Sequence, residues 1–397
     1  MAGRGRASGR GIVALCLVLL AALVGCGGRP AADGTKAEVQ RLLDRRATAV
    51  LDQDPAAFTR TGALSWFQNL SAVPLAGWTY RVTAVRRTGN TATADVELGY
   101  RVQNYDSAPV TVARTVDLSV DVEGQWYVDA ERPAEKAPQQ LWDQGEVVVV
   151  RGEHSLVMGV GQTGETLHSY ADLADRAVPA VSDAWGTDWS RHVVVLVPKS
   201  LAGMAALLGS PASSYRGIAA VTTGETGAPA RAPSDRIIVN PDAYGVLGAV
   251  GKQVVLTHET THVATRTATT AATPLWLSEG YADWIGYRGS GRTPTQAAPE
   301  LQQAIGAGRA PTTLPTDRDF GFGGDADELA RAYESGWLAC RMIADHWGEA
   351  RLREFYAAVG AHDKRAGAVE NAMKSVLGTT LGEFTTEWRN YLLDQLG

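Results

Sequence analysis

Two histidines four residues apart, with a glutamate directly after the first, lie in the stretch VVLTHETTHV at residues 254–263. On a helix this spacing puts the side chains of His258 and His262 on one face, about one turn apart. Two imidazole nitrogens placed in this way can bind one zinc ion, while Glu259, about 100° further round the helix, can reach a water molecule beside the metal. Zinc lowers the pKa of a bound water, and a nearby carboxylate takes the proton as that water attacks a carbonyl. The stretch therefore predicts two zinc ligands and a general base.

A third ligand would distinguish a zinc site from two histidines that merely share a helix, because catalytic zinc sites use three protein ligands and leave one position for water. Ala268, six residues after the second histidine, excludes a third histidine at that spacing. The segment LWLSEGYADWIGY, residues 275–287, is a second candidate helix across a Thr/Ala-rich turn, and its Glu279 lies 17 residues after the second histidine. We predict that Glu279 is the third ligand. Asp283 lies four residues further along the same face.

This arrangement resembles the gluzincin metallopeptidases, whose pattern is HExxH followed by a glutamate in an EG or ExxxD context. The resemblance implies that His258, His262 and Glu279 bind one zinc ion and that Glu259 is the general base. Asp283 matches the aspartate that holds the first ligand histidine in one tautomer in several gluzincins. The alternative for Asp283 is a solvated or capping aspartate.

The C-terminal segment RAYESGWLACRMIADHWG, residues 331–348, is similar to the Tyr-x-x-Gly helix of the aminopeptidase branch of this superfamily. That similarity implies that Tyr333 stabilises the oxyanion formed during hydrolysis, and the alternative is a core tyrosine bonded to a backbone carbonyl. The branch recognises the free amino terminus of its substrate with a Gly-x-x-Glu-Asn strand motif. No such motif precedes His258, which favours an endopeptidase.

Residues 1–25 have the composition of a signal peptide: three arginines, no acidic residue, and an apolar run of about 13 residues that is too short to span a bilayer. The sequence Leu23-Val24-Gly25-Cys26 resembles a bacterial lipobox, which predicts cleavage before Cys26, lipidation of its thiol and an extracytoplasmic protein held at the membrane. The alternative is a plain secretory signal. Cleavage would change the net charge from −6 to −9, because three arginines leave, so we expect no nucleic-acid partner.

The rest of the chain predicts two domains of the α+β class. After a flexible spacer at 26–35, residues 36–133 show a helical apolar stripe and then strands with period-two alternation, which predict a helix packed on an antiparallel meander. This segment resembles the nuclear-transport-factor-2-like fold. Arg114 falls on its apolar register, where it faces a pocket or lies at a strand end with its stem buried. We predict a linker at 134–144 and a zinc metallopeptidase domain at 145–397.

In that second domain, short apolar strands at 146–150, 192–197, 218–222 and 236–239 and a helix at 165–185 precede the HExxH helix and a helical half. The leading hypothesis is a membrane-anchored zinc peptidase acting on a peptide or protein substrate. One alternative is a gluzincin-like scaffold without turnover that serves as a cell-envelope binding or assembly module. Another is an enzyme that hydrolyses a non-peptide amide or ester.

Overall fold

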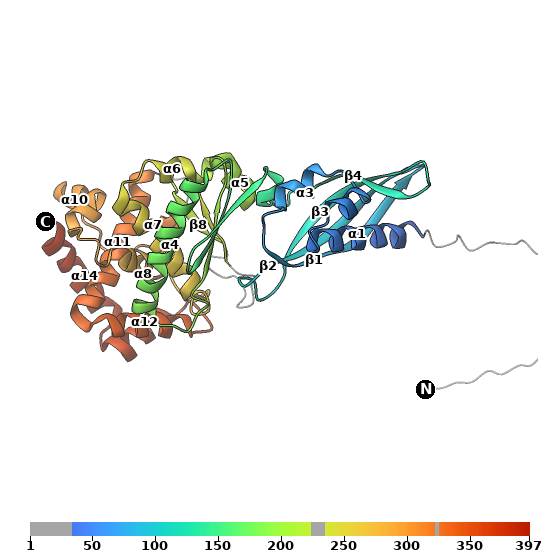
Figure 1. Ribbon diagram of the computed structural model, residues 1–397. Helices are drawn as coiled ribbons and strands as arrows, with labels where there is room; N and C mark the ends of the chain where they lie inside the picture. Colours follow the sequence, from blue (N-terminus) through green and yellow to red (C-terminus); the bar gives the residue numbers. More distant parts are fainter. Residues whose placement is uncertain (1–33, 224–234, 322–324) are drawn as a thin grey trace, which may run out of the picture.

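The computed structural model describes residues 34–223, 235–321 and 325–397 (Figure 1). The predicted signal peptide and the predicted lipid attachment at Cys26 lie outside these residues. Within the described ranges, no helix has both the length and the hydropathy that a bilayer crossing requires.

The N-terminal part is one long helix packed on a four-stranded antiparallel sheet with the strand order β1-β2-β3-β4. Its elements are α1 (Thr35–Leu51), α2 (Pro55–Thr59), α3 (Ser65–Leu70), β1 (Leu75–Thr88), β2 (Thr91–Val102), β3 (Val110–Val120) and β4 (Trp126–Pro133). The apolar stripe of α1, including Val39, Leu42 and Leu43, is buried. In β2, buried residues alternate with more exposed ones, as the period-two pattern predicts.

A second, mixed sheet has the order β5-β6-β7-β9-β8, in which β6, β7 and β9 run parallel and the two outer strands run antiparallel to their neighbours. Its elements, with the turns and helices among them, are η1 (Leu141–Asp143), β5 (Val147–Arg151), β6 (Ser155–Val160), α4 (Gly164–Trp185), β7 (Val193–Val197), α5 (Leu201–Leu208), η2 (Ala212–Tyr215), β8 (Ala220–Thr222), β9 (Ile237–Val239) and α6 (Pro241–Gly245). Our sequence analysis did not identify β6.

The continuous apolar sequence of β7 is explained by burial of the second sheet on both faces. Val193, Val195 and Val197 join the core formed with α4 and α7 (Ala249–Thr265). Val194 and Leu196 point to the opposite face and join the core of the N-terminal sheet. One hydrophobic core is therefore shared between the N-terminal part and the second sheet.

Buried polar contacts also join these two parts. The guanidinium of Arg236, just before β9, donates two hydrogen bonds of 2.9 and 2.8 Å to Asp106, in the β2–β3 connection. Arg114 lies in the middle of β3, so our expectation of a strand end was wrong. Its buried guanidinium donates to Asp143 at 2.7 and 2.8 Å.

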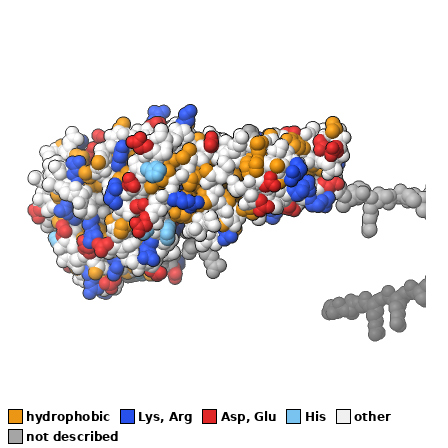
Figure 2. All heavy atoms as spheres, viewed as in Figure 1, with side chains coloured by type: hydrophobic (Ala, Val, Ile, Leu, Met, Phe, Trp, Pro, Cys, Tyr) orange, Lys and Arg blue, Asp and Glu red, His pale blue; other side chains and the backbone are white. Residues whose placement is uncertain are grey.

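The remaining chain is helical, with a core of its own, and gives the molecule the α+β class. Its elements after α7 are α8 (Leu275–Tyr287), α9 (Pro294–Ala297), α10 (Pro299–Gly306), η3 (Asp317–Phe320), α11 (Ala326–Trp347), α12 (Glu349–Gly360), α13 (Ala368–Ala372), η4 (Met373–Leu377) and α14 (Leu381–Leu396). These helices form the end of the molecule away from the N-terminal sheet (Figure 1). On the face in Figure 2, acidic and basic side chains are interspersed over both ends.

Candidate metal centre

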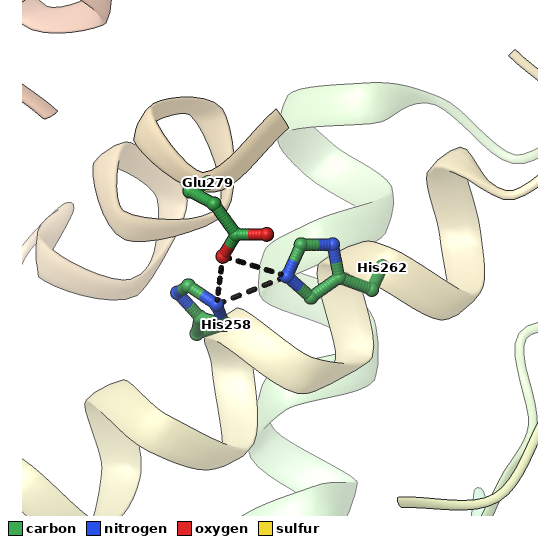
Figure 3. Close-up of side chains that lie close together, drawn as sticks. All are labelled: His258, His262 and Glu279. Atoms are coloured by element: carbon green, nitrogen blue, oxygen red, sulfur yellow. Dashed lines mark hydrogen bonds and ion pairs between the residues drawn. The ribbon is translucent and has the colours of Figure 1, made fainter. Parts of the chain in front are cut away.

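The two histidines of α7 and the glutamate of α8 converge on one point (Figure 3). Nε2 of His258 lies 3.0 Å from Nε2 of His262, and Oε2 of Glu279 lies 3.2 and 3.4 Å from these two nitrogens. Zinc bonds of about 2.0–2.1 Å in a tetrahedral arrangement place neighbouring ligand atoms about 3.3 Å apart. The three side chains therefore fit a zinc ion, and they would supply three of its four ligands.

Glycines on α8 and α11 allow these two helices to approach closely beside this point. A Cβ added at Gly280, the residue after Glu279, would overlap the carbonyl oxygen of Gly336 on α11. A Cβ at Gly336 would lie 2.7 Å from the carbonyl oxygen of Trp276 on α8. Both glycines belong to the motifs that the sequence analysis singled out, and their structural role is to let backbone pack against backbone.

Asp283 lies one turn after Glu279 and binds the other ring nitrogen of His258. Its Oδ1 is 2.7 Å from Nδ1 of His258, and the two side chains are 16% and 12% exposed. When Nε2 of His258 binds a metal, Nδ1 carries the hydrogen and donates it to Asp283. The geometry fits a residue that fixes the tautomer and orientation of His258.

The surrounding carboxylates make this point strongly attractive to positive charge. Burial opposes protonation of His258, but Asp283 and Glu279 outweigh it and raise the pKa of His258 well above its usual range. Burial favours the neutral form of Glu279, but His262 and His258 outweigh it and hold the pKa of Glu279 well below its usual range. Charge that attracts a proton to this cluster also attracts a metal cation, so the two compete for the same nitrogens.

Glu259 is buried and points towards the edge of the second sheet. The hydroxyl of Thr222, the last residue of the outer strand β8, lies 2.7 Å from Oε2 of Glu259 and 3.1 Å from its carbonyl oxygen. The shorter contact is a hydrogen bond that fixes the carboxylate. Thr222 was not predicted from the sequence, because a threonine at the end of a short apolar strand carries no signal of this contact.

Tyr333, on α11, lies beside the cluster of ligands. Its ring centroid is 6.3 Å from that of His258 and 5.1 Å from that of Phe320, which it meets edge-on. The side chain is partly exposed, whereas Trp337 and Cys340, which follow it on the apolar face of α11, are buried. The structure thus brings Tyr333 to the same site as the three ligand residues, Glu259 and Asp283.

Two charged residues that the sequence analysis did not mention lie one turn beyond His262. Nη2 of Arg266 is 3.5 Å from Oδ1 of Asp235. Burial raises the pKa of Asp235 to about 6, although Arg266, His262 and Arg236 all act in the opposite direction. Asp235 precedes β9 and is 31 positions before Arg266 in the sequence, so only the fold brings the pair together.

No protein-family model and no curated protein matches this sequence. Among solved structures, yeast LTA4 hydrolase is similar at 13% identity and a TM-score of 0.39 over 70% of this chain, which spans 44% of that protein. A mutant M1 zinc metallopeptidase from Deinococcus radiodurans, bound to a Tyr-Ser-Ala substrate, is similar at 11% identity and a TM-score of 0.37, covering 81% of this chain and 94% of that one. A second structure of that mutant gives 11% identity and a TM-score of 0.36 over 82% of this chain and 94% of that one. Similarity at this level assigns neither an activity nor a substrate to this chain.

Proposed function

We propose that this protein is a zinc-dependent hydrolase of peptide bonds. The observation that carries the proposal is the convergence of His258, His262 and Glu279 at 3.0–3.4 Å, the ligand separations that tetrahedral zinc requires. A zinc ion bound there would activate a water molecule and polarise the carbonyl of the substrate. The chemistry that remains belongs to side chains of this chain.

Glu259 is the general base in this proposal. It follows a ligand on the same helix but is not itself one of the three converging groups, so its carboxylate is available to accept a proton from the attacking water. The hydroxyl of Thr222 binds one of its oxygens at 2.7 Å and leaves the other for that proton. Asp283 holds His258 in the orientation that directs Nε2 to the ligand point.

Tyr333 is the proposed donor to the carbonyl oxygen, on which negative charge develops as water attacks. Its ring lies beside that of His258, and α11 is held against α8 by the contact between Gly336 and Gly280. A phenol can thus donate from the helical side, opposite the sheet that positions Glu259. Such a donor stabilises the transition state more than the substrate.

We further propose that β8 is the edge along which an extended peptide binds. Among the described residues it pairs with β9 alone, so its outer edge is open to another strand. Its last residue binds the proposed base, which places a peptide on this edge next to the reacting groups. A strand bound in this way can continue in both directions, which fits an endopeptidase.

We also propose that the protein is exported and is held at the outer face of the cell membrane by a lipid on Cys26. This proposal rests on the sequence of residues 1–26 alone: a short apolar run followed by Leu-Val-Gly-Cys.

Metal content and turnover together test the hydrolase. We expect one zinc per chain by elemental analysis of protein purified without chelators, and cleavage of members of a peptide library. Glu259→Gln should keep the zinc and abolish cleavage, because the base is not a ligand. Glu123→Gln, the same change in an exposed turn of the N-terminal sheet, is the matched control.

Protein that binds no divalent metal at neutral pH would refute the proposal. Loss of zinc in Glu259→Gln would show that the roles of ligand and base are assigned wrongly. Cleavage of small amides or esters but of no peptide would keep the site and change the substrate.

A further inference from the structure

A cavity lies between the N-terminal sheet and the second sheet, inside the core that they share. Its volume is about 370 Å³, within the range of small-molecule binding sites. Residues of β2 and β3 form one wall, and residues of β5, β6, β7 and β9 form the other. The cavity is thus a feature of the joint between the two parts and belongs to neither alone.

The walls along most of this cavity are aliphatic or aromatic. They include Val102, Val112, Leu141, Met158, Leu196 and Ile238. No charged side chain interrupts this part of the lining among the described residues. Water gains few hydrogen bonds in such a space, whereas an apolar chain fills it favourably.

One end of the cavity is polar and contains a guanidinium with unused donors. Thr223, Asp235, Arg236 and Arg266 line this end. Nε and Nη2 of Arg266 are buried and have no hydrogen-bond partner among the described residues. The nearest carboxylate oxygen, of Asp235, is 3.5 Å from Nη2, which is beyond the usual hydrogen-bond distance. Buried donors of this kind favour a ligand that brings acceptor oxygens.

The polar end borders the proposed hydrolytic site. Arg266 lies four residues, or about one helical turn, after the ligand His262. Thr223 directly follows Thr222, whose hydroxyl binds Glu259. A ligand whose head reaches Arg266 therefore has its apolar chain in the cavity and its head beside α7.

We propose that this cavity binds a single-chain acyl compound, with the aliphatic chain between the two sheets and the carbonyl or carboxylate oxygens on Arg266. The apolar walls select the chain, and the donors of Arg266 select an acceptor head. Asp235, at the same end, would repel an anionic head, but Arg266, 3.5 Å away, offsets its charge. The inference concerns binding and does not depend on the proposed hydrolysis.

Isothermal titration of the full-length Glu259→Gln protein, with and without added zinc, tests the inference without turnover. The probes are decanoate, N-methyldecanamide and decyltrimethylammonium, each below its micelle concentration. We expect decanoate and N-methyldecanamide to bind with one molecule per chain, and the cation to bind about tenfold more weakly or not at all. Comparison of the first two probes distinguishes a free fatty acid from an acyl amide.

Two further substitutions locate the binding. Val110→Trp fills the cavity from β3 and should abolish binding, whereas Val122→Trp, at a fully exposed position just after β3, is the matched control and should not. Arg266→Gln removes the guanidinium and its positive charge without filling the cavity and should weaken the binding of decanoate by about tenfold. Zinc content and the thermal midpoint of each variant show whether it is folded.

The inference is overturned if none of the probes binds, if the cation binds as tightly as decanoate, or if decanoate binding is unchanged in Arg266→Gln. The last outcome decides the matter even where Val110→Trp does not fold. Failure here leaves zinc binding and peptide cleavage untouched, so it is distinct from failure of the proposed function.

Discussion

Removal of the carboxylate of Asp283 should weaken zinc binding while leaving the protein folded. Oδ1 of Asp283 lies 2.7 Å from Nδ1 of His258, and only 16% of the aspartate side chain is exposed. A hydrogen bond to a charged group contributes about 1.5–3 kcal/mol. Since about 1.4 kcal/mol corresponds to tenfold, Asp283→Ala should weaken zinc binding by about 10- to 150-fold. Asp283→Asn keeps a neutral acceptor and should lose less, about 5- to 10-fold.

The difference in zinc affinity between the wild type and Asp283→Asn should also depend on pH. Asp283 raises the pKa of His258, and a proton on His258 competes with the metal. Asp283→Asn lowers that pKa, so its zinc binding should persist to a lower pH than that of the wild type. The wild-type advantage should therefore be largest at high pH and shrink as the pH falls.

Competition with a chromogenic chelator across pH 5–9 measures both effects. Asp183→Asn, the same change at a residue whose side chain is 68% exposed, is the control and should bind zinc as the wild type does. Equal zinc affinity in the wild type, Asp283→Asn and Asp283→Ala would refute the reasoning and leave Asp283 a structural residue. Equal losses of zinc affinity in Asp283→Asn and Asp283→Ala would show that a neutral acceptor at position 283 contributes nothing.

Substitutions at four other positions give separate tests. Tyr333→Phe should keep its zinc and lose about 100- to 1,000-fold in turnover with little change in KM; wild-type kcat would remove Tyr333 from the mechanism. Thr222→Val, which matches threonine in shape but cannot donate to Glu259, should lower kcat by about tenfold, and Thr222→Ser should restore it; equal rates in all three would contradict the contact. Burial raises the pKa of Glu334 to about 9, so the folded state keeps a proton that the unfolded state loses, and wild-type stability should fall as pH rises from about 4.5 to 9. In urea unfolding, Glu334→Gln should lose less stability than the wild type over that range. Parallel plots of stability against pH for the two proteins would contradict the raised pKa of Glu334. Cys26→Ser should block lipidation and leave the protein unprocessed or released from the membrane fraction of its native host; a wild-type protein that is already soluble would exclude the anchor.

The sequence predicted the helices of the metal centre well because their spacing leaves little freedom. The segment 275–287 is the observed α8, and the HExxH residues lie within α7. A four-residue step on a helix fixes which side chains share a face. For that reason spacing indicated which side chains could share one metal, and the structure brings His258, His262 and Glu279 within 3.4 Å of one another. Their roles as zinc ligands, and that of Asp283 as the partner of His258, stay predictions.

Contacts between distant segments could not be predicted in this way. Thr222 and Glu259 are separated by 37 positions, and neither residue type nor period marks their hydrogen bond. The strand β6 was missed because its sequence, SLVMGV, is a short apolar run that fits a buried strand or part of a helix equally well. Its place in the sheet is decided by parallel pairing with β7.

The packing of the N-terminal sheet against the second sheet could not be predicted from the sequence either. The period-two pattern at 36–133 predicted a unit with one buried face, and the apolar run at 192–197 predicted a strand that the structure shows buried on both faces. Neither pattern states that the two surfaces cover each other. That pairing follows from the shared core and from the ion pair between Asp106 and Arg236.

The same pairing connects the N-terminal sheet to the proposed base. The backbone N–H of Arg236 donates to the hydroxyl of Thr223 at 2.8 Å, while its guanidinium binds Asp106. Thr222, the residue before Thr223, binds Glu259. Since a buried ion pair is costly to break from one side, β8 is held between the N-terminal sheet and α7. The orientation of Glu259 therefore depends on the N-terminal sheet, which the sequence predicts to be a separate domain.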